Sequence, residues 1–381
     1  MIKSLSVKGL NHRVDADLEF NEDLNIITGK NGSGKTTILK LLWYFISGNL
    51  ERLVTEIPFQ SVSITTDSFS VGITQFPSSE IKLTSTFPVK KQGIQLSGTV
   101  EQLDDTLKEL NKHIVRTTKE SLFFPTFRRI EGGFSDLRGV EPSNRSATSS
   151  PETFQSSLER FSSDISTNGH RFIASISTHD VGTLLTQKYA DINEEIRDRQ
   201  SRLLSEISQK FQVSPGDAIG SEISQAVPSV LTDIQQVAKE SERLFKPFLV
   251  LSELTRSILQ YQAIQVVGQN AHGEITKGIT LGEGTDRATL ETTKGAIASD
   301  ILSAGEKQML SFLCYNAFSE NTAIFIDEPE LSLHVDWQRL LLPTLLEQGT
   351  GNQFFIATHS PFIYAKYPDK EIPLGDKGEA N

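Results

Sequence analysis

Near the start of the chain, apolar residues follow two different periods. Short apolar runs at residues 2–7, 14–20 and 24–27 are separated by turn-forming residues, which predicts three strands. After them, apolar positions recur every three or four residues and predict a helix with one buried face, formed by Ile38, Leu41, Leu42, Phe45 and Ile46. A glycine-rich segment joins the third strand to this helix.

In residues 59–100, apolar positions recur at every second residue. Apolar side chains alternate with polar neighbours in short runs, which predicts an antiparallel meander containing Val62, Ile64, Phe69, Val71, Ile73, Ile81, Leu83, Ile94 and Leu96. Helical spacing returns at residues 101–114. Residues 138–157 are rich in serine and proline and predict a linker or mobile loop.

Long helical patterns fill the middle of the chain. Asp180 can cap a helix that continues to Phe211, roughly 45 Å at 1.5 Å per residue. Such a helix fits an ordinary bundle or a projecting arm for a partner or nucleic acid, and both interpretations stay open. Further helix is predicted near residues 223–234 and 248–258, and strand-like runs near residues 274–281 and 288–292.

Residues 29–37 form a complete phosphate-binding loop between a predicted strand and a predicted helix. Backbone amides of such a loop at a helix N-terminus bind a phosphate chain. Lys35 would reach the outer phosphates, and the Thr36 hydroxyl would hold a magnesium ion. The segment therefore predicts binding of ATP or GTP with Mg²⁺ through Gly29, Lys30, Asn31, Gly32, Ser33, Gly34, Lys35, Thr36 and Thr37.

Two apolar strands later in the chain end in chemically active side chains. Residues 323–328 end in Asp327 and Glu328, and buried strands of this kind deliver such residues to the carboxyl edge of a parallel sheet. Asp327 is expected to bind magnesium, and Glu328 to polarise the attacking water as a general base. Residues 354–360 contain His359, which can contact a terminal phosphate and its attacking water.

Ser303 and Gly305 lie just before a helical run at residues 309–318. With Glu306 three residues later, Ser303 fits a capping box, which is an ordinary way to begin a helix. A serine and a glycine at a helix N-terminus also form an anion site. Because this segment is far along the chain from the phosphate-binding loop, its anion would belong to the nucleotide of a second molecule.

Length, composition and charge limit the classes of function that the chain can have. The 381 residues suggest two domains, or one domain with a large insertion. No apolar run is long enough to span a membrane, and the N-terminus lacks a secretory signal. Cys314 is the only cysteine, which argues against disulfides and cysteine-based metal sites and indicates a reducing, cytoplasmic compartment. A net charge of −11 disfavours a surface covered with phosphate-binding residues, but it allows a local basic groove.

Taken in order, these segments resemble the ABC-type ATPase head, in the branch that includes SMC, RecF and OLD-like proteins. The resemblance implies an α/β fold: a P-loop ATPase head with a mixed sheet core, an antiparallel β subdomain and a large helical insertion. Residues 1–137 and 274–381 would be the two halves of the head. Residues 138–157 would be the linker, and residues 158–273 the insertion.

The same resemblance assigns roles to the site residues. Ser303 and Gly305 would belong to the signature motif, Glu328 would be the catalytic base, and His359 would be the switch histidine. Two heads would bind two ATP molecules between them as a homodimer, or a multiple of it. Hydrolysis would then separate the heads.

The chain departs from the family pattern in several places. Ala304 replaces the second glycine of the signature, and His334 stands where transporters carry an aspartate. The glutamine loop is not evident; Arg128 or Arg129 near that point would approach a phosphate instead. The residue that stacks on adenine is also open, with His12 and Arg13 as candidates, and ATP is preferred over GTP on the resemblance alone.

Within this branch, the chain looks most like the PtuA-type ATPase subunits of bacterial anti-phage defence systems, such as Septu and some retron operons. The residues that carry this likeness are 124–129, 330–334 and the long helical insert. Too few residues follow His359 for the nuclease domain of OLD proteins, so a separate effector, such as a nuclease, is expected. The alternative is a DNA repair or recombination ATPase of the RecF type; nucleic acid binding stays open, and a transport engine or a non-hydrolysing role is disfavoured.

Overall fold

The computed structural model describes residues 1–78, 80–87, 93–126, 129–130, 154–176, 178–210, 219–259, 264–267, 278–281 and 303–375. These residues form two compact units. The first comprises Met1–Ile176, Ser303–Phe312 and Ser319–Asn381, and the second comprises Ser177–Leu302 and Leu313–Phe318. Each unit is described by itself.

A six-stranded parallel sheet forms the centre of the first unit. The strands lie in the order β10 (His170–Phe172), β8 (Ser121–Phe124), β14 (Ala323–Asp327), β15 (Gln353–Ala357), β3 (Leu24–Gly29) and β16 (Glu371–Leu374). Every residue of β8 and β15 is buried, as expected for parallel strands covered on both faces. This explains why residues 122–124 and 354–357 are uninterrupted apolar runs. Helix α1 (Lys35–Ile46) packs against β3, β8, β14 and β15.

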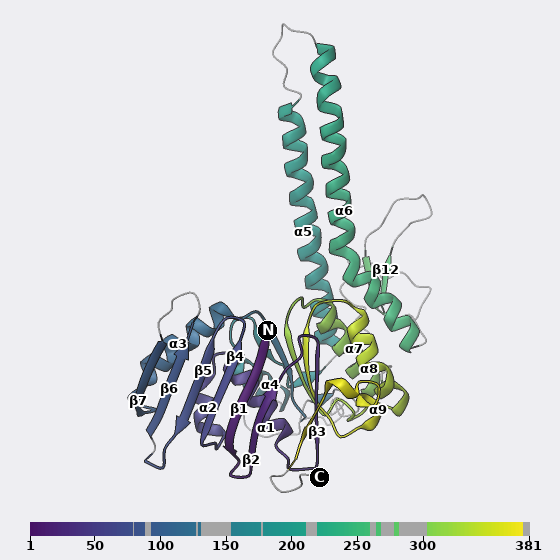
Figure 1. The fold of residues 1–381 in the computed structure, drawn as a ribbon. Helices are drawn as coiled ribbons and strands as arrows, with labels where there is room; N and C mark the ends of the chain where they lie inside the picture. The colour runs from purple at the N-terminus through teal and green to yellow at the C-terminus, as the bar shows by residue number, and fades with distance from the viewer. Residues whose placement is uncertain are drawn as a thin grey trace, which may run out of the picture. The chain divides into compact units, whose positions relative to one another are not determined.

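A second, antiparallel sheet belongs to the same unit. Its strands lie in the order β2 (Val14–Glu19), β1 (Ile2–Leu10), β4 (Ser61–Thr66), β5 (Ser70–Gln75), β6 (Glu80–Thr86) and β7 (Gly93–Thr99), and they lie side by side in Figure 1. Alternate side chains are buried, which confirms the predicted meander, and the buried set includes Val62, Ile64, Val71, Ile73, Ile81 and Leu83. Helices α2 (Leu50–Glu56) and α3 (Asp104–Thr117) contribute Leu50, Leu53, Leu107, Leu110 and Ile114 to the shared core.

Residues 154–176 complete the first unit. Helix α4 (Phe154–Ile165) packs on β10, and β10 pairs with β8 through His170 and Ser121. A short parallel pair follows, β11 (Ser175–Ile176) with β9 (Arg129–Ile130). The predicted insertion begins at residue 158, whereas this division places residues up to Ile176 in the first unit, because a three-residue strand extends the parallel sheet.

Shorter helices finish the first unit near its carboxyl end. They are α8 (Val335–Glu347), α9 (Pro361–Tyr364) and a 3₁₀ turn η1 (Pro368–Lys370), together with the beginning of α7 (Ala304–Ala317). The predicted linker at residues 138–157 lies almost wholly outside the described residues, as does the strand predicted near residues 288–292.

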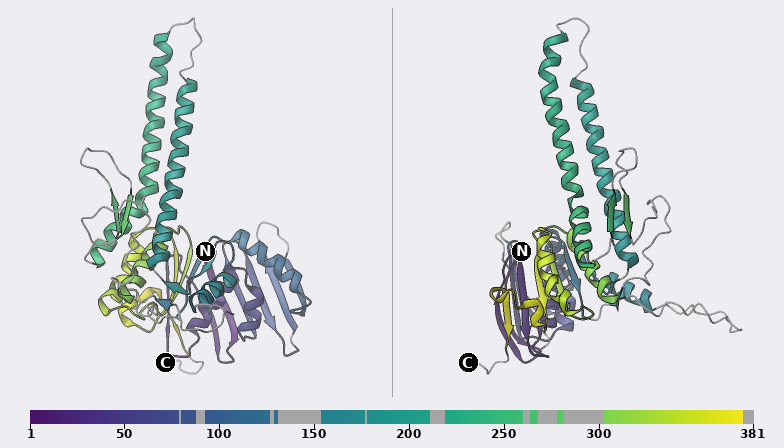
Figure 2. Two further views of the ribbon diagram at one scale, coloured as in Figure 1. Left: turned by 180° about the vertical axis from the view of Figure 1, so that it is seen from behind. Right: turned by 90° about the vertical axis from the view of Figure 1, so that its right-hand side faces the viewer.

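The second unit contains an antiparallel pair of long helices, α5 (Thr178–Lys210) and α6 (Ile219–Leu259), which lie side by side in Figures 1 and 2. Val181, Leu185 and Ile196 are buried on α5, so the predicted helical period is confirmed. Helix α6 is continuous through Pro228 and Pro247, although the pattern indicated two separate stretches. An antiparallel pair, β12 (Ile264–Val267) with β13 (Gly278–Leu281), completes this unit.

None of the helices in the described ranges combines the length and the apolar content needed to cross a lipid bilayer.

Candidate nucleotide-binding site

The loop between β3 and α1 depends on glycines. Gly29, Gly32 and Gly34 have φ values of 145°, 82° and 94°, which side-chain-bearing residues rarely adopt. A Cβ on Gly29 would also lie 2.6 Å from the carbonyl oxygen of Leu374 in β16. Gly29 therefore lets β3 pass close to β16. The loop then leads directly into α1, whose first amide groups lack hydrogen-bond partners within the helix.

Lys35, the first residue of α1, is only 5% exposed. Its Nζ donates to the carbonyl oxygens of Gly29 and Lys30, at 3.0 and 3.2 Å, and lies 2.7 Å from Nε2 of His359. Burial lowers the pKa of Lys35 from its ordinary value, while the nearby carboxylates, Glu328 first, oppose that effect.

Asp327 ends β14 and is 1% exposed. Its Oδ1 accepts a hydrogen bond of 3.1 Å from the Thr36 hydroxyl, and its Oδ2 accepts one from the Thr126 hydroxyl. Thr126 was not predicted from the sequence. It follows β8, the strand beside β14, so only the order of the strands in the sheet brings it to this carboxylate.

Glu328 and His359 follow the neighbouring strands β14 and β15. Glu328 has φ 46°, in the left-handed region, and its amide donates to the carbonyl oxygen of Ala357 at 2.8 Å. This backbone turn directs the Glu328 side chain to 3.7 Å from Nε2 of His359. Both side chains keep partial contact with solvent, 28% for Glu328 and 32% for His359.

These groups surround a cavity of about 340 Å³, lined by Asn11, Asn31, Gly32, Gly34, Lys35, Thr36, Thr37, Glu328 and His359. Most predicted loop residues line it, whereas Gly29, Lys30 and Ser33 shape the loop beside it. Asn11 was missed by the sequence analysis: it lies in the β1–β2 turn with φ 48°, and its amide donates to Thr37 Oγ1 at 3.2 Å. His12 and Arg13 are exposed and do not line the cavity.

Residues 1–364 match the family model described as "AAA ATPase domain". This match covers nearly the whole chain and includes every residue that lines the cavity. The chain belongs to the AAA ATPase domain family.

More distant likenesses accompany this family match. Endonuclease GajA of Bacillus cereus (strain VD045) is 41% identical over 63 residues, which are 15% of this chain and only 11% of GajA. The SmcHead crystallised with the C-winged helix domain of ScpA has a TM-score of 0.39 at 12% identity, covering 96% of this chain and 91% of its own. The Pyrococcus furiosus Smc head domain with an extended coiled coil, bound to the C-terminal domain of ScpA, has a TM-score of 0.37 at 13% identity, with coverages of 98% and 94%.

The segment predicted to be the signature motif lies at the beginning of α7. The amide of Ser303 donates to Glu306 Oε2 at 2.6 Å, and the amide of Glu306 donates to Ser303 Oγ at 3.3 Å. This is the reciprocal capping box expected of an ordinary helix start. A Cβ on Gly305 would lie 2.5 Å from the Ser332 carbonyl oxygen and 3.4 Å from the Trp337 ring, so Gly305 allows α7 to pack closely on the turn after β14.

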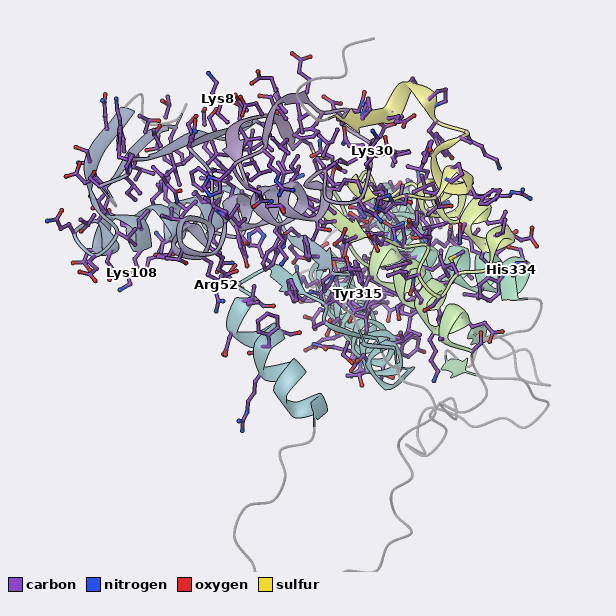
Figure 3. All side chains as sticks on the ribbon, turned by 90° about the horizontal axis from the view of Figure 1, so that it is seen from below. Lys8, Lys30, Arg52, Lys108, Tyr315 and His334 are labelled. Carbon is purple, nitrogen blue, oxygen red and sulfur yellow. The ribbon has the colours of Figure 1, made fainter. Side chains whose placement is uncertain are left out.

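Other predicted residues of the ATPase domain lie away from the cavity or outside the described residues. Ser303 is exposed, and neither Ser303 nor Gly305 lines the cavity of its own chain. His334 caps α8, and Figure 3 shows it apart from Lys30 of the loop. Arg128 lies outside the described residues, and only the backbone of Arg129 is described.

The donor set beside the loop suits a hard cation. Within the described residues, no three His, Cys, Asp or Glu side chains gather into a site that could hold a metal by themselves. Mg²⁺ does not need such a cage, because it is held by one or two protein oxygens together with phosphates and water. The Thr36 hydroxyl and the Asp327 carboxylate, 3.1 Å apart, are oxygens of this kind, so the residues fit the ion that this ATPase family uses with its nucleotide.

Proposed function

We propose that this chain binds ATP with Mg²⁺ and hydrolyses it. The observation that carries the proposal is the convergence of Lys35, Thr36, Asp327, Glu328 and His359 beside one cavity. Lys35 and the loop amides would hold the phosphates, and Thr36 and Asp327 would hold the ion. When bound there, Mg²⁺ would supply positive charge that offsets the charge of the phosphates.

Glu328 is the best candidate for the general base. It lines the cavity and is partly solvated, so a water molecule can stand between its carboxylate and a terminal phosphate. His359 lies 3.7 Å from it and 2.7 Å from the Lys35 ammonium, so it is close to both the base and the phosphate-binding cation. This arrangement favours hydrolysis over nucleotide binding alone.

We further propose that two copies of the chain act as a nucleotide-driven switch. The exposed Ser303 at the start of α7 supports this proposal, since its hydroxyl and the helix N-terminus would complete the site of a second copy. To move a population from 1:99 to 99:1, nucleotide must favour one arrangement by about 5.5 kcal/mol. In a head-to-head dimer, this difference would come from the contacts that each bound nucleotide makes with both copies.

The switch would control a separate effector, such as a nuclease, in anti-phage defence in the cytoplasm. The likeness to PtuA-type ATPase subunits and the local similarity to endonuclease GajA support this role. The alternative is a repair or recombination ATPase of the RecF type, which predicts hydrolysis stimulated by DNA. Turnover that rises severalfold with duplex DNA, without any effector, would favour this alternative.

The test compares Glu328→Gln with wild type in single-turnover hydrolysis. Loss of a general base typically slows the chemical step by about 10²–10⁴-fold. We expect the variant to bind ATP with wild-type affinity, to hydrolyse it slower by that factor, and to stay dimeric longer in light scattering. The matched control is Glu347→Gln, which neutralises an exposed glutamate on α8.

Equal single-turnover rates would remove Glu328 from the proposed role. The dimer is tested in the same background by mixing Asn31→Cys and Ser303→Cys chains, since both positions are exposed and the native Cys314 is buried. ATP-dependent crosslinking between the two variants is expected. Monomers under all nucleotide conditions, or a dimer without this crosslink, would contradict the proposed arrangement.

A further inference from the structure

The turns that follow β14 and β15 carry Glu328 and His359, and they lie beyond the end of the strand pairing. The last paired residues are Asp327 and Ala357. One more backbone bond follows, from the Glu328 amide to the Ala357 carbonyl, and then the left-handed Glu328 turns the chain away. Side chains must therefore hold the two turns together beyond this point.

Glu330 is one of these side chains. Its Oε1 accepts a 2.7 Å hydrogen bond from the amide of His359, and its Oε2 accepts a 2.8 Å bond from the Thr358 hydroxyl. Thr358 is fully buried, and its Oγ1 also accepts from the Ser360 amide at 3.0 Å. The hydroxyl proton of Thr358 is thereby directed at Glu330, so both carboxylate oxygens hold the backbone on which His359 is carried.

Gln338 of α8 makes a second link, one residue further on. Its amide group donates to the Leu333 carbonyl at 2.8 Å, and its Oε1 accepts from the Ser360 hydroxyl at 2.6 Å. The His359 backbone is therefore fixed by Glu330 at its own amide, and the next residue is fixed by Gln338. Of these two links, the one from Glu330 touches His359 itself.

The position of the His359 backbone decides where its ring lies. The imidazole Nε2 is 2.7 Å from Lys35 Nζ and 3.7 Å from Glu328 Oε1. A displacement of about 1 Å in an active site can cost 10²-fold in rate. Glu330 does not line the cavity; it acts on the site through the groups that it holds and through its charge, which opposes the effect of burial on the pKa of Lys35.

We propose that Glu330 is a positioning residue for the ATP hydrolysis proposed above, on which this inference rests: its two hydrogen bonds to Thr358 and His359 set the imidazole between Lys35 and Glu328. The role is geometric. It requires two acceptors, or an acceptor and a donor, at the end of a side chain of this length. A negative charge is not required.

The experiment measures steady-state ATP hydrolysis by the full chain and its variants. Glu330→Ala removes both bonds, and kcat is expected to fall about 10–100-fold while KM for ATP changes less than about threefold. Glu330→Gln keeps the length and can accept from the His359 amide while donating to Thr358 Oγ1, so it should retain kcat within about fivefold. A Gln variant as slow as the Ala variant would overturn the geometric role.

A double-mutant cycle tests whether Glu330 acts through His359. If it does, Glu330→Ala combined with His359→Ala should turn over no slower than His359→Ala alone, because the residue being positioned is already missing. Multiplicative losses would overturn the proposal. The matched control is Glu347→Ala, which removes an exposed glutamate of α8 and should leave kcat unchanged.

A readout without hydrolysis separates this proposal from the proposed function. In protein labelled with ¹⁵N-histidine, the His359 amide signal is identified by its loss in His359→Ala. Glu330→Ala should shift this signal and speed its exchange with solvent, whereas Glu347→Ala should not. An unchanged amide signal overturns the Glu330 contact. Wild-type protein that does not hydrolyse ATP overturns the proposed function, and with it the catalytic part of this inference.

Discussion

Two histidines at opposite strand ends of the same parallel sheet have contrasting surroundings, one at the carboxyl edge and one at the amino edge. His359 follows the carboxyl end of β15, has a side chain 32% exposed, and faces the Lys35 ammonium and the Glu328 carboxylate. His170 begins β10 and is 1% exposed; its Nδ1 lies 2.8 Å from the Ser121 hydroxyl and its Nε2 3.2 Å from the Thr118 hydroxyl. One ring is held between a lysine and a glutamate, and the other is buried between two neutral hydroxyl groups.

The difference follows from what each edge of the sheet must do. At the carboxyl edge, β3, β14 and β15 end in Gly29, Asp327 and Ala357, and left-handed residues follow β3 and β14, Glu328 among them. Such turns are strained, and strain is tolerated at functional sites. At the amino edge, His170 pairs directly with Ser121, so its ring satisfies buried polar groups. The same residue type therefore contributes chemistry at one edge and stability at the other.

Replacing each histidine with alanine should affect a different property, activity for His359 and stability for His170. His359→Ala should lower kcat by about 10²–10³-fold with little change in unfolding free energy, because its ring serves the reaction. His170→Ala should lower the unfolding free energy by about 2–4 kcal/mol, through the lost volume and the unpaired Ser121 hydroxyl, and should leave kcat within about threefold. Steady-state kinetics and urea unfolding of both variants measure this. Matching losses of activity and stability in the two variants would refute the contrast.

Lowering the pH should reduce the stability that His170 contributes at the amino edge. Burial lowers the pKa of His170 to about 4, below the unfolded value of about 6.5. Between these two pKa values, the unfolded chain binds a proton at this histidine that the folded chain does not bind. The contribution of neutral His170 to the unfolding free energy is therefore complete above pH 6.5 and is lost as the pH falls towards 4. The gap in unfolding free energy between wild type and His170→Ala should narrow by about 2 kcal/mol from pH 7 to pH 5. A gap that does not change with pH would show that His170 is not held neutral.

The smallest effect is expected from Thr118→Val. This change removes the Thr118 hydroxyl, which lies beside Nε2 of His170 and also within hydrogen-bonding distance of the Ile46 and Ile114 carbonyls. It keeps the contact of His170 with Ser121 and most of the volume. The unfolding free energy should fall by about 1 kcal/mol, the usual net value of one hydrogen bond. Thermal unfolding next to Thr118→Ser, which keeps the hydroxyl, measures the difference. Equal losses in the two variants would assign the effect to packing alone.

How far the sequence predicts the site depends on how local each contact is. The loop residues, Asp327, Glu328 and His359 could be named in advance because each is the end of a strand motif, and parallel strands bring their carboxyl ends to one edge. Thr126 and Asn11 could not, since their contacts depend on β8 lying beside β14 and on the conformation of the β1–β2 turn. Glu330 was visible only as part of residues 330–334, which carry the likeness to PtuA-type subunits; its partners became evident from the distances to Thr358 and His359.

The same distinction applies to the fold. Periods of two and of three to four predicted the meander, α1 and α5 from neighbouring residues alone. The sheet membership of residues 170–172 could not be predicted this way, because a three-residue strand has no measurable period and is defined by its pairing with Ser121. The sequence pattern predicted helix at residues 223–234, which include Pro228, and at residues 248–258, but not between them. Pro247 argues against helix there, yet α6 is continuous and pairs with α5.

The close approach of Gly305 to Trp337 gives the chain a built-in optical reporter. The sequence contains only two tryptophans. Trp43 is fully buried in the core and supplies a constant background, whereas the partly exposed indole of Trp337 lies against the first turn of α7. Intrinsic fluorescence can therefore follow events at this helix start in unlabelled protein, on the timescale of a stopped-flow mixing experiment.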